Sequence, residues 1–137
     1  MGPNEKRLYG PVGRRGLAAT ETAITLPLLV LLVFGAIELT NAIFLKQSLT
    51  IAAYEGARAV ARPAATSDNG EARVDAVLAA RGVSNYEVSF SPEVTASTPR
   101  GTTLKVTVSA PVAAHLVGPV WFFGERTMMS EVCMVRL

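Results

Sequence analysis

The sequence has few of the residues that catalysis, metal binding and disulfides require. Its 137 residues include one histidine, His115, and one cysteine, Cys133. A single cysteine cannot form a disulfide within the chain, and the residues show no metal-ligand spacing. The chain also has no glycine-rich phosphate loop and no nucleophile elbow, and its carboxylates are scattered rather than paired. We therefore expect no catalytic residue, no bound metal and no cofactor, and we predict that the protein is not an enzyme.

Charge is scarce and unevenly distributed. Only 18% of the residues are charged whereas 50% are hydrophobic, which is too apolar for a disordered tail. Residues 1–16 contain four cations and one anion (net +3), residues 17–45 contain two glutamates (net −2), and residues 46–137 contain nine cations and eight anions (net +1). The basic excess therefore lies before the hydrophobic run, and no later stretch resembles a nucleic-acid patch. We predict no nucleic-acid partner.

The longest hydrophobic run decides the class of protein. Residues 22–37 carry no charge and, with Glu38 included, the apolar segment continues to Leu45. A helix over residues 22–45 would be about 36 Å long at ~1.5 Å per residue, which is enough to cross a hydrocarbon core of ~30 Å. The run is apolar on every side, which disfavours the core helix of a soluble protein. It is also longer than the apolar part of a cleaved secretory signal. We expect a helix that stays in the lipid bilayer.

The charge distribution predicts the orientation of this helix. Cations immediately before a membrane span favour a cytoplasmic N-terminus. We therefore expect a single-pass protein of the inner (cytoplasmic) membrane with its C-terminal domain periplasmic or extracellular. The predicted parts are a basic cytoplasmic leader (1–16), a transmembrane helix with an amphipathic stem (17–62) and a small extracytoplasmic domain (63–137).

Several residues within the span have predicted consequences. Pro27 removes one backbone hydrogen bond, so we expect a kink or local loosening there. Gly35 would permit close contact with another helix. Glu38 and Asn41, three positions apart, lie on one face. Glu38 is either a buried carboxylate with a function or a residue at the outer interface, where water reaches it.

Beyond Lys46 the pattern predicts an amphipathic stem that ends before Pro63. Its apolar positions recur at helical spacing and include Leu45, Leu49, Ala52, Ala53, Gly56, Ala57 and Val60. The positions left for solvent or partners are Lys46, Gln47, Tyr54, Glu55, Arg58 and Arg62. The small-residue side would let another helix or a sheet approach closely, and we expect it to pack against the protein's own sheet.

The remaining residues predict a small α+β domain. Residues 63–70 have the turn chemistry of a linker, and Asp68 with Glu71 suggests a capping box for a helix over 71–81, stopped by Gly82. Strict alternation predicts strands over 86–91 and 103–109, and a third strand is expected over 126–136. The expected fold is α+β: a long N-terminal transmembrane helix and stem, one short helix and a three-stranded antiparallel sheet packed on the stem.

We also have expectations for three features of this domain, with an alternative for two of them. The apolar stretch Val112–Gly124 is too short for a second span, and we expect it in the core, with an exposed aromatic patch as the alternative. His115 is expected to be packed in its apolar surroundings. For Cys133 we expect a buried free thiol in a strand, with pairing between chains as the alternative.

The residues that precede the span have a recognisable arrangement. Arg14-Arg15-Gly16-Leu17-Ala18-Ala19-Thr20-Glu21 resembles the class III signal of type IV pilin-like proteins. The resemblance implies a prepilin peptidase that cuts after Gly16, so that Leu17 becomes the new N-terminus and Glu21 the fifth mature residue. Glycine would allow close approach of the backbone to the protease. In the alternative interpretation the chain is an unprocessed signal anchor, in which Gly16 begins a helix and Glu21 lies at the headgroups.

The resemblance extends to a family. The chain through Arg62 is similar to the TadE-like minor pseudopilins of tight-adherence (Flp-type) pilus systems. The matching runs are Arg15–Glu21, then Leu26-Pro27-Leu28-Leu29, then Phe34-Gly35-Ala36-Ile37-Glu38, and finally Ala53-Tyr54-Glu55-Gly56-Ala57-Arg58.

This resemblance implies a structural or assembly component of an adhesive pilus or related secretion system. Its partners would be the prepilin peptidase, other pilin-like subunits and the pilus assembly machinery. Glu21 and Glu38 are the candidate assembly residues. A signal-anchored exported binding protein unrelated to pili is the alternative, and a membrane-tethered enzyme is a third hypothesis.

Overall fold

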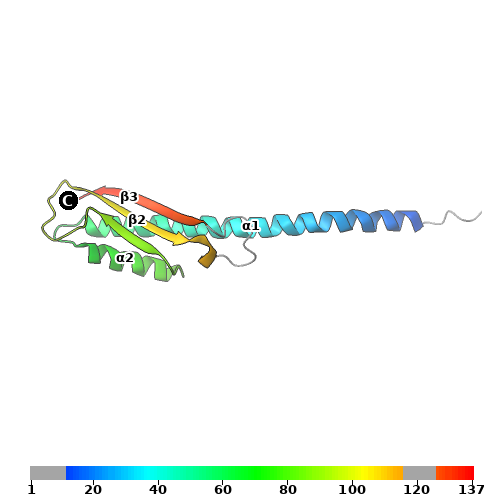
Figure 1. Ribbon diagram of the computed structural model, residues 1–137, viewed down its shortest axis with the longest axis horizontal. Coiled ribbons are helices and arrows are strands. Elements are labelled where there is room, and N and C mark those ends of the chain that lie inside the picture. Colours follow the sequence, from blue (N-terminus) through cyan, green and yellow to red (C-terminus); the bar gives the residue numbers. More distant parts are fainter. Residues whose placement is uncertain (1–11, 116–125) are drawn as a thin grey trace, which may run out of the picture.

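The computed structural model describes residues 12–115 and 126–137, with side chains described from Gly16 onwards. Its elements are the helices α1 (Val12–Val60) and α2 (Ser67–Ala80), the strands β1 (Glu87–Ser91), β2 (Thr103–Pro111) and β3 (Thr127–Val135), and the short 3-10 helix η1 (Val112–His115). The first part of α1 projects as a rod from a domain in which α2 and the sheet lie against its second part (Figure 1). The predicted α+β fold is confirmed.

Helix α1 runs through both predicted parts, the span and the stem, without interruption. It contains 49 residues, with Pro27 inside it, and Figure 1 shows one continuous rod. The expected kink or loosening at Pro27 therefore does not break the helix, because a proline removes one backbone hydrogen bond while the other residues of its turn keep theirs. The helix ends at Val60, before Pro63 as predicted.

The second part of α1 is packed closely by α2. All seven apolar positions predicted for the stem are buried. A Cβ atom added to Gly56 would lie 2.6 Å from Cγ2 of Val74, and one added to Gly70 would lie 2.5 Å from Cγ1 of Val60. Such separations are well inside van der Waals contact, so each helix needs a glycine where the other crosses it. This need explains the small residues of the stem.

Helix α2 starts earlier than predicted. It begins at Ser67, so residues 67–70 are helical rather than part of a linker. The cap is formed by Thr66 and Asn69 instead of Asp68 and Glu71, since the Thr66 backbone N–H donates to Asn69 Oδ1 at 2.9 Å. A tertiary contact fixes this start: the Ser67 N–H donates to the Val94 carbonyl at 2.8 Å, and the Val94 N–H donates to Ser67 Oγ at 2.9 Å.

The predicted stop of α2 at Gly82 is confirmed. Gly82 has a φ of +67°, which a residue without a side chain adopts readily. The N–H of Val83 donates to the Leu78 carbonyl, and that of Gly82 donates to the Ala79 carbonyl, which is the Schellman pattern of a helix end.

The three strands form an antiparallel sheet in the order β1-β2-β3, which buries one face against the helices. The inner face of β2 is fully buried and consists of Leu104, Val106, Val108 and Ala110. In register, Val106 lies opposite Phe90 of β1 and Val132 of β3. The strict alternation that predicted two of these strands therefore corresponds to one packed and one solvent-facing side.

The prediction of a buried thiol at Cys133 was wrong. Cys133 is exposed and lies opposite Lys105 on the outer face of the sheet. Its neighbours Val132 and Met134 turn inwards, and successive residues of a strand point to opposite faces. Lys105 pairs on that outer face with Glu131, with Nζ and Oε1 2.9 Å apart.

Sequence analysis gave no role to Arg136, yet this residue joins three segments. Its side chain is only 3% exposed and donates to the carbonyls of Val60 at 3.1 Å, Ala65 at 3.2 Å and Thr95 at 3.3 Å. A guanidinium at the end of a helix also interacts favourably with its C-terminal carbonyls. Arg136 therefore fastens the last described strand to the end of α1.

The segment Val112–Gly124 is described only at its start. Val112 is buried in the core, as expected, and His115 is half-buried in η1. The prediction for the aromatic residues of this segment falls outside the described residues.

Candidate membrane and assembly surfaces

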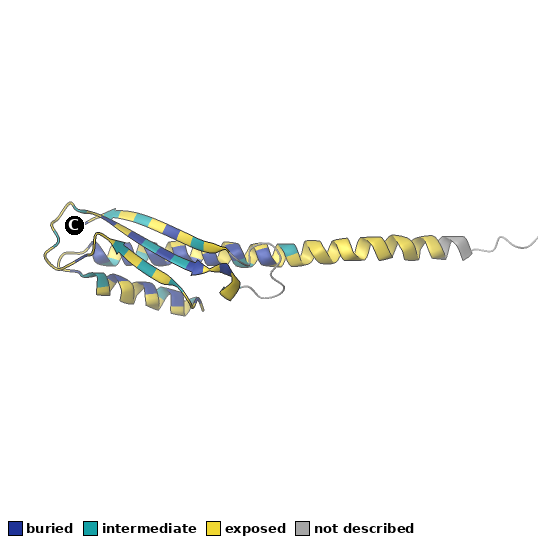
Figure 2. Cartoon of the chain, viewed as in Figure 1, coloured by how far each residue is buried: buried dark blue, intermediate teal, exposed yellow. Residues whose placement is uncertain are grey.

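Residues 16–37 of α1, here called the projecting segment, are left largely uncovered by the other residues that the structure describes. Each of them is exposed except Gly35, which is half-buried, and Figure 2 shows this part of the helix almost entirely in yellow. The exposed large side chains lie on all sides and include Leu17, Ile24, Leu26, Leu28, Leu29, Leu31, Leu32, Phe34 and Ile37. The helix is long and apolar enough to cross a membrane. A surface of this size and composition requires lipid or other apolar helices around it.

The polar groups of the projecting segment are largely satisfied within the helix. Thr20 Oγ1 donates to the Leu17 carbonyl at 2.8 Å, Thr22 Oγ1 to Ala18 at 2.9 Å, and Thr25 Oγ1 to Glu21 at 2.7 Å. A hydroxyl that binds its own backbone leaves no unpaired donor for an apolar environment. The threonines are therefore compatible with a helix immersed in lipid.

The candidate processing and assembly residues Gly16, Leu17 and Glu21 all lie in α1. Leu17 and Glu21 are four positions apart, so they occupy the same face in successive turns. All three residues are exposed, and a Cβ added to Gly16 would meet nothing within 4 Å. The Gly16–Leu17 bond itself is helical, so a protease would have to unwind it, which glycine makes easier than other residues would.

Glu38, the other candidate assembly residue, lies where the projecting segment meets the domain. Its side chain is only 4% exposed, and it is the first fully buried described residue along α1. Water therefore does not reach it freely, contrary to one of its two sequence interpretations. Asn41, on the same face, has a buried Nδ2 without a hydrogen-bond partner. Two polar groups, the Glu38 side chain and Asn41 Nδ2, are thus buried at this end of the domain.

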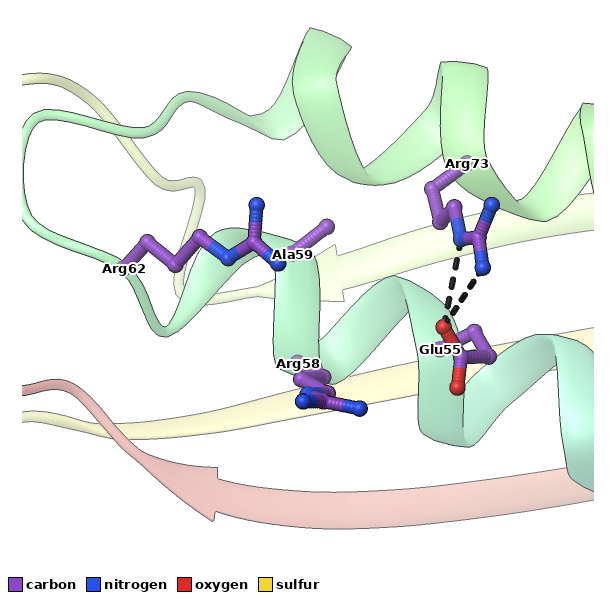
Figure 3. A pocket seen from close by; sticks show the side chains of 5 residues that line it. All are labelled: Glu55, Arg58, Ala59, Arg62 and Arg73. Atoms are coloured by element: carbon purple, nitrogen blue, oxygen red, sulfur yellow. Dashed lines mark hydrogen bonds and ion pairs between the residues drawn. The ribbon is translucent and has the colours of Figure 1, made fainter.

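The far end of α1 carries an open groove lined by charged side chains. This groove, here called the arginine groove, has a volume of about 350 Å³ and is lined by Glu55, Arg58, Ala59, Arg62 and Arg73. Figure 3 shows Arg73 reaching from α2 to Glu55 on α1, while Arg62 extends back along α1 towards Ala59. Arg73 donates from Nε at 3.2 Å and from Nη2 at 2.9 Å to Glu55 Oε2.

The sequence predicts only part of the arginine groove. Glu55, Arg58 and Arg62 were predicted to face solvent or partners, but Arg73 was not associated with them. Its position depends on the packing of α2 on α1, for which the sequence contains no signal. The guanidinium groups of Arg58 and Arg62 have no hydrogen-bond or ion-pair partner among the residues that the structure describes. One carboxylate and three guanidiniums leave the groove with a net charge of +2.

The opposite flank of α2 is acidic. Asp68, Glu71 and Asp75, here called the acidic flank, are spaced by three and four residues, so they lie on one face of the helix, and all three are exposed. Asp75 accepts a hydrogen bond from the Tyr86 hydroxyl at 2.8 Å. Burial, together with this hydrogen bond and the nearby charges of Asp75 and Glu71, raises the pKa of Tyr86 to about 12.

In comparisons with known proteins, the chain matches a known family within the long helix α1. No curated protein and no solved structure matches the chain. Residues 16–58 match the family model of TadE-like proteins. The match begins at the candidate cleavage glycine, includes the whole projecting segment and ends at Arg58 of the arginine groove. The family resemblance predicted from the sequence is therefore confirmed over this segment, and it suggests a component associated with the Tad pilus. The long apolar helix fits a membrane-anchored protein.

Proposed function

We propose that the chain is a minor pseudopilin-like subunit of a tight-adherence pilus or a related secretion system. The observation that carries the proposal is the projecting segment, which is apolar on all sides and continues without a break into a folded domain. Such a helix can be held first by the bilayer and then by the apolar helices of other subunits. Its N-terminus lies in the cytoplasm and the domain lies outside the inner membrane, because the basic residues precede the span.

Maturation occurs at Gly16 in this proposal. A prepilin peptidase cuts the Gly16–Leu17 bond and removes four cations and one anion, which changes the formal net charge of the chain from +2 to −1. The freed α-ammonium of Leu17 then stands one helical turn from Glu21. Support comes from the family match, which starts at Gly16, and from the open space around this glycine.

Glu21 acts in assembly. An ionised carboxylate within an apolar helix costs about 2.5–3.5 kcal/mol at the bilayer centre on insertion-based scales, and less near the interface. An isolated subunit avoids most of this cost by keeping Glu21 near the headgroups. An assembled subunit pairs Glu21 with the Leu17 ammonium of a neighbour, which also favours one axial register. Glu38 is the second assembly candidate, since it lies buried where the projecting segment enters the domain.

The proposal is tested by measuring two quantities in the same native membranes: the mature N-terminus and the co-purification of other pilin-like subunits. Wild-type protein should begin at Leu17, and replacement of Gly16 by a bulky residue should leave the leader attached. Glu21→Gln should preserve processing but lower co-purification. Glu93→Gln removes an exposed carboxylate of the domain and serves as the control.

Two results would contradict this proposal. Wild-type chains that keep residues 1–16 would favour the signal-anchored binding protein. Unchanged co-purification of Glu21→Gln would make Glu21 an incidental interfacial residue, and lost cleavage would assign it to recognition by the peptidase.

A further inference from the structure

We propose that the arginine groove binds the acidic flank of a second copy of this chain, side by side in the membrane. The two surfaces have opposite charge. The groove has a net charge of +2, and the guanidinium groups of Arg58 and Arg62 have no partner within the described part of the chain. Asp68 and Glu71 of the acidic flank likewise have no ion-pair partner among those residues, and both are exposed.

The two surfaces face in opposite directions on one chain. Arg73 and Asp75 are two positions apart on α2, which separates them by about 160° around a helix of 3.6 residues per turn. Arg73 points towards α1, where it binds Glu55, whereas Asp75 points towards Tyr86 beside β1. A copy therefore presents its groove on one side and its acidic flank on the other. Such a contact is heterologous and can be repeated from copy to copy.

The two surfaces also lie at the same height along the rod. Helix α2 crosses α1 at Gly56, where an added Cβ would lie 2.6 Å from Val74 and 3.5 Å from the Gly70 carbonyl. Asp68, Glu71 and Asp75 are within about two turns of this crossing on α2. Arg58 is two residues from it on α1, and Arg62 follows two residues after the end of α1. Copies anchored by the same projecting segment stand at one level, so the groove of one meets the flank of the next without axial displacement.

Distance from the membrane excludes lipid as the ligand of the groove. Arg58 lies 13 residues beyond Leu45, the last residue of the predicted span, which corresponds to about 20 Å of helix. Headgroups next to the span do not extend that far. A single exposed ion pair contributes little, but tethering raises the effective concentration of neighbouring copies, and several pairs form together. The contact should weaken as the salt concentration rises.

The test uses disulfide cross-linking between two differently tagged full-length copies in native membranes. Both copies carry Cys133→Ser. The first copy carries Ala59→Cys in its groove, and the second carries Ala72→Cys, next to Glu71. Oxidation should join the two tags. Arg58→Glu with Arg62→Glu in the first copy should lower the yield about five-fold, because like charges then face each other. Asp68→Lys with Glu71→Lys in the second copy should restore it.

The matched control places the same arginine substitutions in the second copy, whose groove does not take part in the monitored contact. The yield should then stay at the wild-type level, which separates loss of the contact from loss of folding or insertion. A second control pairs Ala59→Cys with Ser89→Cys on the outer face of the sheet and gives the yield of random collisions.

The inference relies on the proposed function only for the parallel, membrane-anchored arrangement, and the two fail separately. The contact would be overturned by a cross-linking yield no higher than that of random collisions, or by a yield that does not change with the charge substitutions. Either result would leave the pseudopilin proposal standing if the mature chain starts at Leu17. A charge-dependent cross-link between chains that keep residues 1–16 would overturn only the pseudopilin proposal. Loss of another subunit from Arg58→Glu/Arg62→Glu membranes without a copy-to-copy cross-link would assign the groove to that subunit.

Discussion

The two halves of α1 are both apolar helix, but among the described residues only those of the second half are packed against α2 and the sheet. Residues 16–37 display large aliphatic side chains on every side and are exposed, whereas residues 38–60, here called the packed segment, bury one stripe that is rich in alanine. Figure 2 shows the change from yellow to blue along the same helix. The comparison shows that hydrophobicity alone does not determine what covers a helix. Side-chain size and spacing do.

Small side chains explain how the packed segment is covered from within the chain. Gly56 and the alanines beside it let the backbone of α2 come close, and Leu45 and Leu49 fill the remaining space. The projecting segment has no such stripe of small residues, and its large side chains stay exposed in the described part of the structure. Its large side chains suit lipid, or the helices of other subunits, around the whole circumference.

The largest difference between the two halves should appear when one leucine is truncated in each. Leu49→Ala should destabilise the domain by about 2–5 kcal/mol, because Leu49 is fully buried and leaves a cavity. Leu31→Ala, in the projecting segment, should leave domain unfolding unchanged. The domain stability of both variants is measured by denaturant unfolding of the full chain in detergent, with hydrogen exchange of the β2 amides as the readout. Equal losses would show that the projecting segment is part of the cooperative unit.

A smaller but more specific difference is expected at two glycines. Gly56→Leu should cost about 1–3 kcal/mol of domain stability, because the new side chain collides with Val74 of α2. Gly35→Leu should not lower domain stability, since a Cβ there meets nothing within 4 Å. The same unfolding experiment applies. A stable Gly56→Leu variant would mean that α2 does not lie against α1 at this crossing.

The smallest expected effect is a pH dependence of the folding stability of the domain, to which the projecting segment does not contribute. The pKa of Tyr86 is raised from 10.0 to about 12 by burial and by the hydrogen bond to Asp75, so the folded state holds this proton more tightly than the unfolded state does. The resulting stabilisation is fully present below pH 10 and is lost as the pH rises from 10 to about 12. Tyr86→Phe should cost about 1 kcal/mol or less at neutral pH and should remove this part of the alkaline loss.

Glu21→Gln is the control for the alkaline experiment, because it changes a titratable group of the projecting segment. Its unfolding profile between pH 9 and pH 12 should match that of the wild type. An alkaline loss of stability that persists unchanged in Tyr86→Phe would contradict the assignment to the Tyr86–Asp75 contact.

The sequence by itself determined the elements whose causes are local. The uncharged run of residues 22–37 predicted a membrane-length helix, the spacing from Leu45 to Val60 predicted the buried side of the stem, and Gly82 predicted the end of α2. Alternation predicted the strands. In each case the signal and the structure involve neighbours within a few residues, because helical and strand periodicities repeat over that distance.

Tertiary structure decided which side chains from different elements come together. The side of the sheet on which Cys133 lies, the cap at Thr66 instead of Asp68, the pairing of Arg73 with Glu55 and the burial of Arg136 all depend on how α1, α2 and the sheet pack. Residues 73 and 55 are 18 positions apart, and residues 136 and 60 are 76 apart. No local periodicity encodes such a pairing, because it is set by the close packing of whole elements rather than by the preferences of neighbouring residues.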